Sequence, residues 1–172
     1  MRRLSLVSLV GIVVALFAAL GALVSAAAQA TAQTAAQPTP TEAIYFSDTA
    51  PFRAHLVENQ QWLEGIQQAM QTGHADEVST DELSNLTREL FAAKRGFARA
   101  IPSARLDQYH RTIEESLDRA YTAAVLLLRA QVTDSGAEHD AHVEEAGQYT
   151  ASSGKLLNEA AGLLAATSLA VQ

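Results

Sequence analysis

From residue 49 to the end of the chain, apolar residues recur at alternating steps of three and four. This spacing places them on one face of an α-helix, and such a stripe is stable when it is buried against other helices. The first stripe consists of Phe52, Leu56, Leu63, Ile66 and Met70. Asn59 is its one polar member. The pattern predicts an all-α fold whose helices bury their stripes against one another.

Three breaks divide this pattern into four helices. Gly73 is typical of the residue just beyond a helix C-terminus, and Ser79 followed by Glu82 is the signature of a capping box at the next helix start. Pro102 ends the second helix, because proline disfavours helical geometry in the residue before it. The sequence Asp-Ser-Gly at residues 134–136 ends the third helix. The expected helices cover residues 49–72, 80–100, 103–132 and 137–169. Since the connections are short, sequential helices must run antiparallel, which predicts an up-down-up-down four-helix bundle domain over residues 48–172.

The N-terminal region has the pattern of an export signal. Arg2 and Arg3 precede an uncharged apolar run over residues 4–24, and small residues then offer cleavage sites after Ala28 or Ala30. We therefore predict a signal peptide over residues 1–30. The alternative is an uncleaved anchor, since a helix over this run can cross a hydrocarbon layer of about 30 Å. Either reading places the rest of the protein outside the cytoplasm, in the periplasm or secreted.

Residues 31–47 are expected to be a disordered linker. Residues 31–43 contain two prolines, one charge and no large apolar side chain, so they cannot offset the entropy of ordering by burial. The short apolar cluster at residues 44–46 is expected to pack against the domain before the first helix begins.

Composition excludes several classes of protein. The chain has no cysteine, which excludes disulfides, thiolate metal sites and a lipid-modified cysteine. It carries 12 Lys and Arg against 19 Asp and Glu, a formal charge of -7. A protein that binds nucleic acid by neutralising phosphates is basic, so we expect no nucleic-acid partner.

The bundle topology sorts the charges into two ends. The acidic end comprises Asp76, Glu77, Asp81, Glu82, Asp134, Glu138, Asp140, Glu144 and Glu145, together with His74, His139 and His142. The basic end comprises Arg53, Lys94, Arg95, Arg99, Arg105 and Arg111. Helix dipoles account for part of this division. The remainder indicates contact between the basic end and an anionic envelope surface, with ordinary solvated charge as the alternative.

The acidic end also offers candidate metal ligands. His139, His142 and Glu145 follow one another at steps of three, so they share a helix face, and His74 is expected on the neighbouring loop. Imidazole and carboxylate ligands suit Zn, Cu or Ni. The alternative is a solvated helix start, because no fixed motif such as H-E-x-x-H is present.

The residues give less support to a haem site, a di-iron site or a catalytic site. Met70 and His142 could hold a haem between helices, although Met70 also fits as core filler. A di-iron centre needs two Glu-x-x-His pairs, and only Asp107 with His110 approximates one. We expect His110 to be a core-edge residue bonded to Glu159 or His55. No nucleophile motif is present, which predicts a protein that is not an enzyme.

The residues around the predicted proline turn carry a resemblance. Residues 97–102, with the sequence Phe-Ala-Arg-Ala-Ile-Pro, are followed by Leu106, Tyr109, His110 and Leu117 and then by a long alanine-rich helix. Over residues 80–168 this resembles a loose pattern in uncharacterised exported helical domains of bacteria, many of them lipoproteins. The resemblance implies a bundle outside the cytoplasm, and it implies no activity, because such domains have no established one.

These observations together predict an exported, non-enzymatic four-helix bundle that acts as an interaction or envelope-associated module. Its partner is expected to be an unknown protein or an anionic envelope surface, with membrane insertion only if the N-terminal segment stays uncleaved. The alternative is a bundle that binds divalent metal at the acidic, His-containing end.

Overall fold

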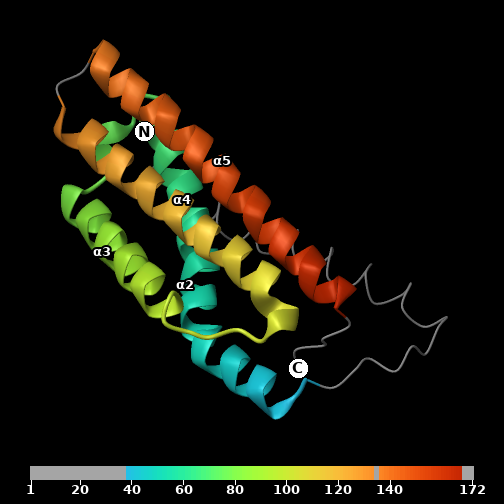
Figure 1. Ribbon diagram of the computed structural model, residues 1–172. Coiled ribbons are helices and arrows are strands. Elements are labelled where there is room, and N and C mark those ends of the chain that lie inside the picture. Colours follow the sequence, from blue (N-terminus) through green and yellow to red (C-terminus); the bar gives the residue numbers. More distant parts are fainter. Residues whose placement is uncertain (1–37, 134–135, 168–172) are drawn as a thin grey trace, which may run out of the picture. The chain divides into compact units, whose positions relative to one another are not determined.

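The structure is a computed structural model that describes residues 38–133 and 136–167. Within these residues it contains four long helices, two short 3-10 turns and no strand (Figure 1). The helices are α2 (Pro40–Gln71), α3 (Thr80–Phe97), α4 (Asp107–Val132) and α5 (Ala137–Ala166). The turns are η1 (Ala75–Glu77) and η2 (Ala104–Leu106). The predicted all-α fold is confirmed.

The predicted signal peptide, residues 1–30, lies outside the described residues. Within the described part of the chain, no helix combines the length and the apolar character that crossing a membrane requires. The described residues belong to one compact unit, which includes the four helices α2, α3, α4 and α5.

Helix α4 lies at the centre of this unit. It packs against each of the other helices, and α3 and α5 flank it on opposite sides (Figure 1). Connections of a few residues join antiparallel neighbours, as the up-down-up-down topology requires. The fully buried large apolar side chains come from α2, α3, η2 and α4. They are Leu56, Leu63, Leu83, Leu90, Phe97, Leu106, Leu117 and Leu127.

Helix α5 contributes small side chains instead, which bring it close to α4. Ser116 Oγ donates to the carbonyl oxygen of Ser153 at 2.9 Å, and Ser153 Oγ donates to the carbonyl oxygen of Ser116 at 3.0 Å. Both serines are completely buried. Ala120, Ala124 and Ala146 are also fully buried, so the two backbones can approach closely enough for these bonds.

The first helix begins nine residues earlier than predicted, which corrects the boundary of the linker. The linker was expected to extend to residue 47, with residues 44–46 packed against the domain, but residues 40–47 form the first two turns of α2. Thr39 caps the helix in a capping box with Glu42, and Pro40 occupies the first turn, where its missing N–H costs nothing. Tyr45 and Phe46 are buried in the core. The prolines that suggested disorder mark a helix start.

Pro51 lies inside α2, and the helix changes direction in this region (Figure 1). Proline lacks the N–H of a helical hydrogen bond and its ring crowds the carbonyl four residues before it, so it bends a helix. Arg53 Nη2 donates to the carbonyl oxygen of Phe46 at 2.9 Å, across the bend. This change of direction places the first turns of α2 next to the connection between α3 and α4.

Gly96 is required by the packing of α2 on α3. A Cβ at this position would lie 2.4 Å from Cε1 and Cζ of the Phe52 ring. We expect Gly96→Ala to lower the free energy of unfolding by about 1–3 kcal/mol, because the ring or a backbone must shift. Urea unfolding followed by circular dichroism measures this change.

Gly65 in α2 is the matched control, because a Cβ there would have no atom within 4 Å. Gly65→Ala is expected to raise the free energy of unfolding by about 0.5–1 kcal/mol through the lower backbone entropy of the unfolded chain. Equal stabilisation by both substitutions would contradict the close contact at Gly96.

Candidate functional site

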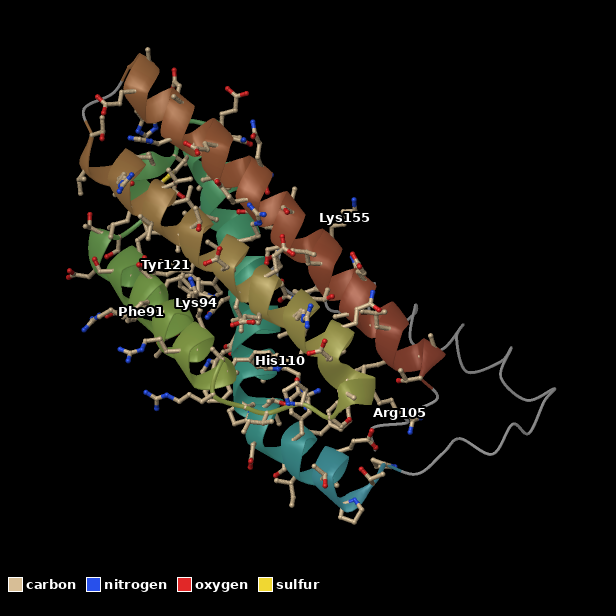
Figure 2. The ribbon with its side chains drawn as sticks, in the orientation of Figure 1. Phe91, Lys94, Arg105, His110, Tyr121 and Lys155 are labelled. Atoms are coloured by element: carbon tan, nitrogen blue, oxygen red, sulfur yellow. The ribbon has the colours of Figure 1, made fainter. Side chains whose placement is uncertain are left out.

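A buried hydrogen bond joins α2 to α4 at the basic end of the bundle. The hydroxyl of Tyr45 lies 3.0 Å from Nδ1 of His110. The imidazole also stacks on the ring of Phe97, with centroids 4.7 Å apart and planes at 14°. Figure 2 shows His110 in the interior, between α4 and α2. The expected bond to a neighbouring helix is present, but its partner is Tyr45 rather than Glu159 or His55, because α2 begins early enough to include Tyr45.

Burial determines the protonation states of Tyr45 and His110. Desolvation lowers the pKa of His110, and the carboxylates of Glu114 and Asp107 oppose that effect without reversing it. Desolvation also raises the pKa of Tyr45. Both groups are therefore neutral near pH 7, and the phenol can donate its hydrogen to Nδ1.

Glu42 ties the connection between α3 and α4 to the start of α2. Its carboxylate accepts from the backbone N–H of Thr39 at 2.9 Å and from Ser103 Oγ at 3.2 Å. The side chain is only 2% exposed. The bond from the Thr39 backbone is the largest of the effects that lower the pKa of Glu42, and desolvation opposes it. A buried carboxylate with these partners holds the connection in one place.

Four cations of the predicted basic end contact a carboxylate or an aromatic ring of the described residues. Arg53 stacks on Phe46, with its guanidinium 5.3 Å from the ring centroid. Lys94 pairs with Asp118 and lies over the ring of Tyr121, as Figure 2 shows. Arg111 pairs with Asp107 at 2.8 Å, and the guanidinium of Arg95 lies over Phe91.

Arg99 and Arg105 remain, one on each side of Ile101. Neither makes an ion pair with a described residue. Arg105 Nη2 donates to the carbonyl oxygen of Thr167 at the end of α5 (Figure 2). Ile101 is 85% exposed, more than any other large apolar residue described. The connection between α3 and α4 thus presents an apolar side chain flanked by two cations.

The predicted metal ligands do not converge. His139 Nδ1 lies 3.0 Å from the carbonyl oxygen of Ala130, and His74 Nδ1 lies 3.0 Å from Thr72 Oγ1. His142 Nε2 is 3.9 Å from Glu138. Glu145 lies in a separate hollow with Arg119 and Tyr149. Among the described residues, no three His, Asp or Glu side chains are arranged to hold a metal ion.

A groove that the sequence did not predict lies between α2 and α3. Helix α2 contributes His55, Glu58, Asn59 and Trp62 to it. Helix α3 contributes Glu82, Asn85, Leu86 and Glu89. The volume is about 360 Å³. We refer to it as the α2–α3 groove. The polar Asn59 within an apolar stripe was the one sequence signal that pointed to it.

Comparison with models of known protein families, with curated proteins and with solved structures finds no match to this chain. The functional argument therefore depends on the residues and geometry described above.

Acidification is expected to destabilise the protein through His110. The pKa of this residue in the folded protein lies below its unfolded value of about 6.5, so the unfolded chain binds the proton first. Its contribution to stability is complete above about pH 6.5 and falls as the pH decreases below that value. The measurement is the free energy of unfolding between about pH 7 and pH 5.

His110→Gln keeps an acceptor for Tyr45 and removes the titration, so it should flatten this pH dependence. His55→Gln, at an exposed position of α2, should leave the dependence unchanged. Identical slopes for the native protein and for His110→Gln would contradict the role of His110.

The metal hypothesis has its own test. It predicts that Zn(II), Cu(II) or Ni(II) binds with a Kd below about 10 μM in calorimetry, and that His139→Ala and His142→Ala each weaken the binding. Glu159→Ala, on the distant half of α5, serves as the control. No binding at that concentration by the native protein would refute the hypothesis.

Proposed function

We propose that the protein is an exported, non-enzymatic module that attaches to an anionic surface of the cell envelope through its basic end. The observation that carries the proposal is the connection between α3 and α4, where the exposed Ile101 stands between Arg99 and Arg105. Export is supported by the charge and apolar pattern of residues 1–30.

The charge distribution supports an oriented attachment. The chain carries a formal charge of -7, so an anionic surface repels most of the molecule. Arg99 and Arg105 supply the local attraction, at about 1 kcal/mol for each cation near an anionic lipid surface. Ile101 can enter the interfacial layer, where burial of its apolar side chain adds to binding.

The rigid support behind this connection also favours the proposal. Glu42 holds Ser103, and the buried Tyr45, His110 and Phe97 lie behind it. A surface loop that is fixed before binding loses little conformational entropy on attachment. The acidic end points the opposite way along the bundle and remains in solvent.

Co-sedimentation with vesicles tests the proposal, using the chain from Ala36 onward, whose described residues form one compact unit. We expect binding to vesicles that contain phosphatidylglycerol, little binding to pure phosphatidylcholine, and weaker binding as salt increases. Arg99→Gln should lower the partition coefficient about fivefold, the equivalent of about 1 kcal/mol. Ile101→Ser should lower it as well.

Arg129→Gln is the matched control, because Arg129 is an exposed arginine in the last turn of α4, at the other end of the bundle. Its partition should equal that of the native protein. Equal binding to neutral and anionic vesicles, or equal loss in both arginine variants, would refute attachment through the basic end.

A further inference from the structure

We propose that the outer face of α3 binds an acidic helix of a partner protein. Carboxylates of that helix pair with Arg88 and Arg95, and an apolar side chain of the helix packs on Phe91. This face is separate from the connection between α3 and α4 that carries the exposed Ile101. The proposal therefore assigns the protein a second binding surface, with a protein rather than the envelope surface as its partner.

Helix α3 carries two stripes with helical spacing. The buried stripe faces the core and consists of Leu83, Leu86, Leu90, Ala93 and Phe97. The outer face is a second stripe, at steps of four and three, and consists of Ser84, Arg88, Phe91, Arg95 and Ala98. The carboxylates of Glu82 and Glu89 line the α2–α3 groove instead. All the formal charge on the outer face is therefore positive, on a chain whose formal charge is -7.

Phe91 is the apolar centre of the outer face. It is 45% exposed, and its ring packs on the ring of Tyr121 from α4, with centroids 5.6 Å apart and planes at 42°. The Nζ atom of Lys94 lies 5.6 Å from the centroid of the Tyr121 ring. Figure 2 shows these three residues together where α3 meets α4. Since the ring is held before a partner arrives, binding costs it little conformational entropy.

Arg88 and Arg95 carry charge that their contacts do not neutralise. The guanidinium of Arg95 lies 5.7 Å from the centroid of the Phe91 ring, and Arg88 donates to the side-chain oxygen of Asn85. A ring and an amide have no net charge, and neither arginine makes an ion pair with a described residue. A guanidinium can pair with a carboxylate through two parallel hydrogen bonds. The two arginines therefore offer two sites for carboxylates.

The spacing of the outer face indicates a helix as the partner. Arg88 and Arg95 are two turns apart, about 10 Å along the axis, and Phe91 lies between them. A helix with carboxylates at the same two-turn spacing and an apolar residue between them matches all three positions. Aromatic residues and arginine are also the residues that protein interfaces favour, and opposite charge on the partner supplies specificity.

The same features make a lipid surface the weaker choice for this face. Insertion into a bilayer needs an apolar side chain that projects, as Ile101 does with an exposed fraction of 85%. The Phe91 ring instead packs against Tyr121. In addition, the half-exposed carboxylate of Asp118 lies beside Lys94, and a flat anionic surface would repel it.

Designed helices test the proposal, using the chain from Ala36 onward, whose described residues form one compact unit. The probe is a capped peptide of three Glu-Ala-Ala-Leu-Ala-Ala-Gln repeats, which is long enough to form a helix. We expect it to bind with a Kd below about 1 mM in calorimetry. A peptide with Lys in place of each Glu should not bind, and one with Ser in place of each Leu should bind more weakly. Failure of the glutamate peptide to bind, or equal binding of the lysine peptide, would overturn the proposal.

Variants locate the binding on the outer face. Arg88→Gln and Arg95→Gln should each weaken binding of the glutamate peptide about threefold, because each removes one charge pair. Phe91→Ser should weaken it about fivefold, because the apolar contact is lost. Lys155→Gln is the matched control, since Lys155 is an exposed cation on α5 (Figure 2). Equal losses in Lys155→Gln and in the arginine variants would overturn the assignment to α3.

Vesicle binding separates this surface from the basic end. Phe91→Ser should leave the partition to phosphatidylglycerol vesicles unchanged, whereas Ile101→Ser should lower it. Urea unfolding of both variants checks that the helical fold persists. If Phe91→Ser lowered the vesicle partition as much as Ile101→Ser, the outer face would belong to the lipid-binding surface and the proposal of a protein partner would be overturned.

Discussion

Burial against α4 is the interaction on which the other helices depend. No disulfide is possible in this chain, so stability comes from packing. Helix α4 offers two kinds of surface: leucines such as Leu117 and Leu127 face the interior, and small residues with Ser116 face α5. The other helices bury their apolar residues against it. A change that moves α4 therefore affects both the basic end and the α2–α3 groove.

The basic end and the α2–α3 groove are formed by different parts of the bundle. At the basic end, Glu42 and the Tyr45–His110 bond hold the α3–α4 connection, so Ile101 and its flanking arginines are presented on a fixed support. In the α2–α3 groove, antiparallel helices place Trp62 and Asn59 opposite the glutamates of α3. One region carries cations and the other carries carboxylates.

Local signals in the sequence predicted much of the fold. The N-cap at Ser79 and the break before Pro102 correctly separated α3 from its neighbours, because both act within a few residues of the chain. The same type of signal at Thr39 and Glu42 was missed, since two prolines nearby favoured disorder. The predicted partners of His110 were also wrong, because Tyr45, which was assigned to the linker, belongs to α2 and bonds to the imidazole.

The amino-acid sequence alone predicts that the protein is all-α, that four helices alternate in direction, and that charge separates into two ends. These properties follow from periodicity, caps and short connections, which are encoded by neighbouring residues. Only the tertiary structure decided that Arg53, Lys94, Arg95 and Arg111 are engaged while Arg99 and Arg105 flank an exposed Ile101. It alone placed Asn59 and Trp62 in one groove with Glu82 and Glu89, because side chains far apart in the sequence meet only through the packing of one helix on another.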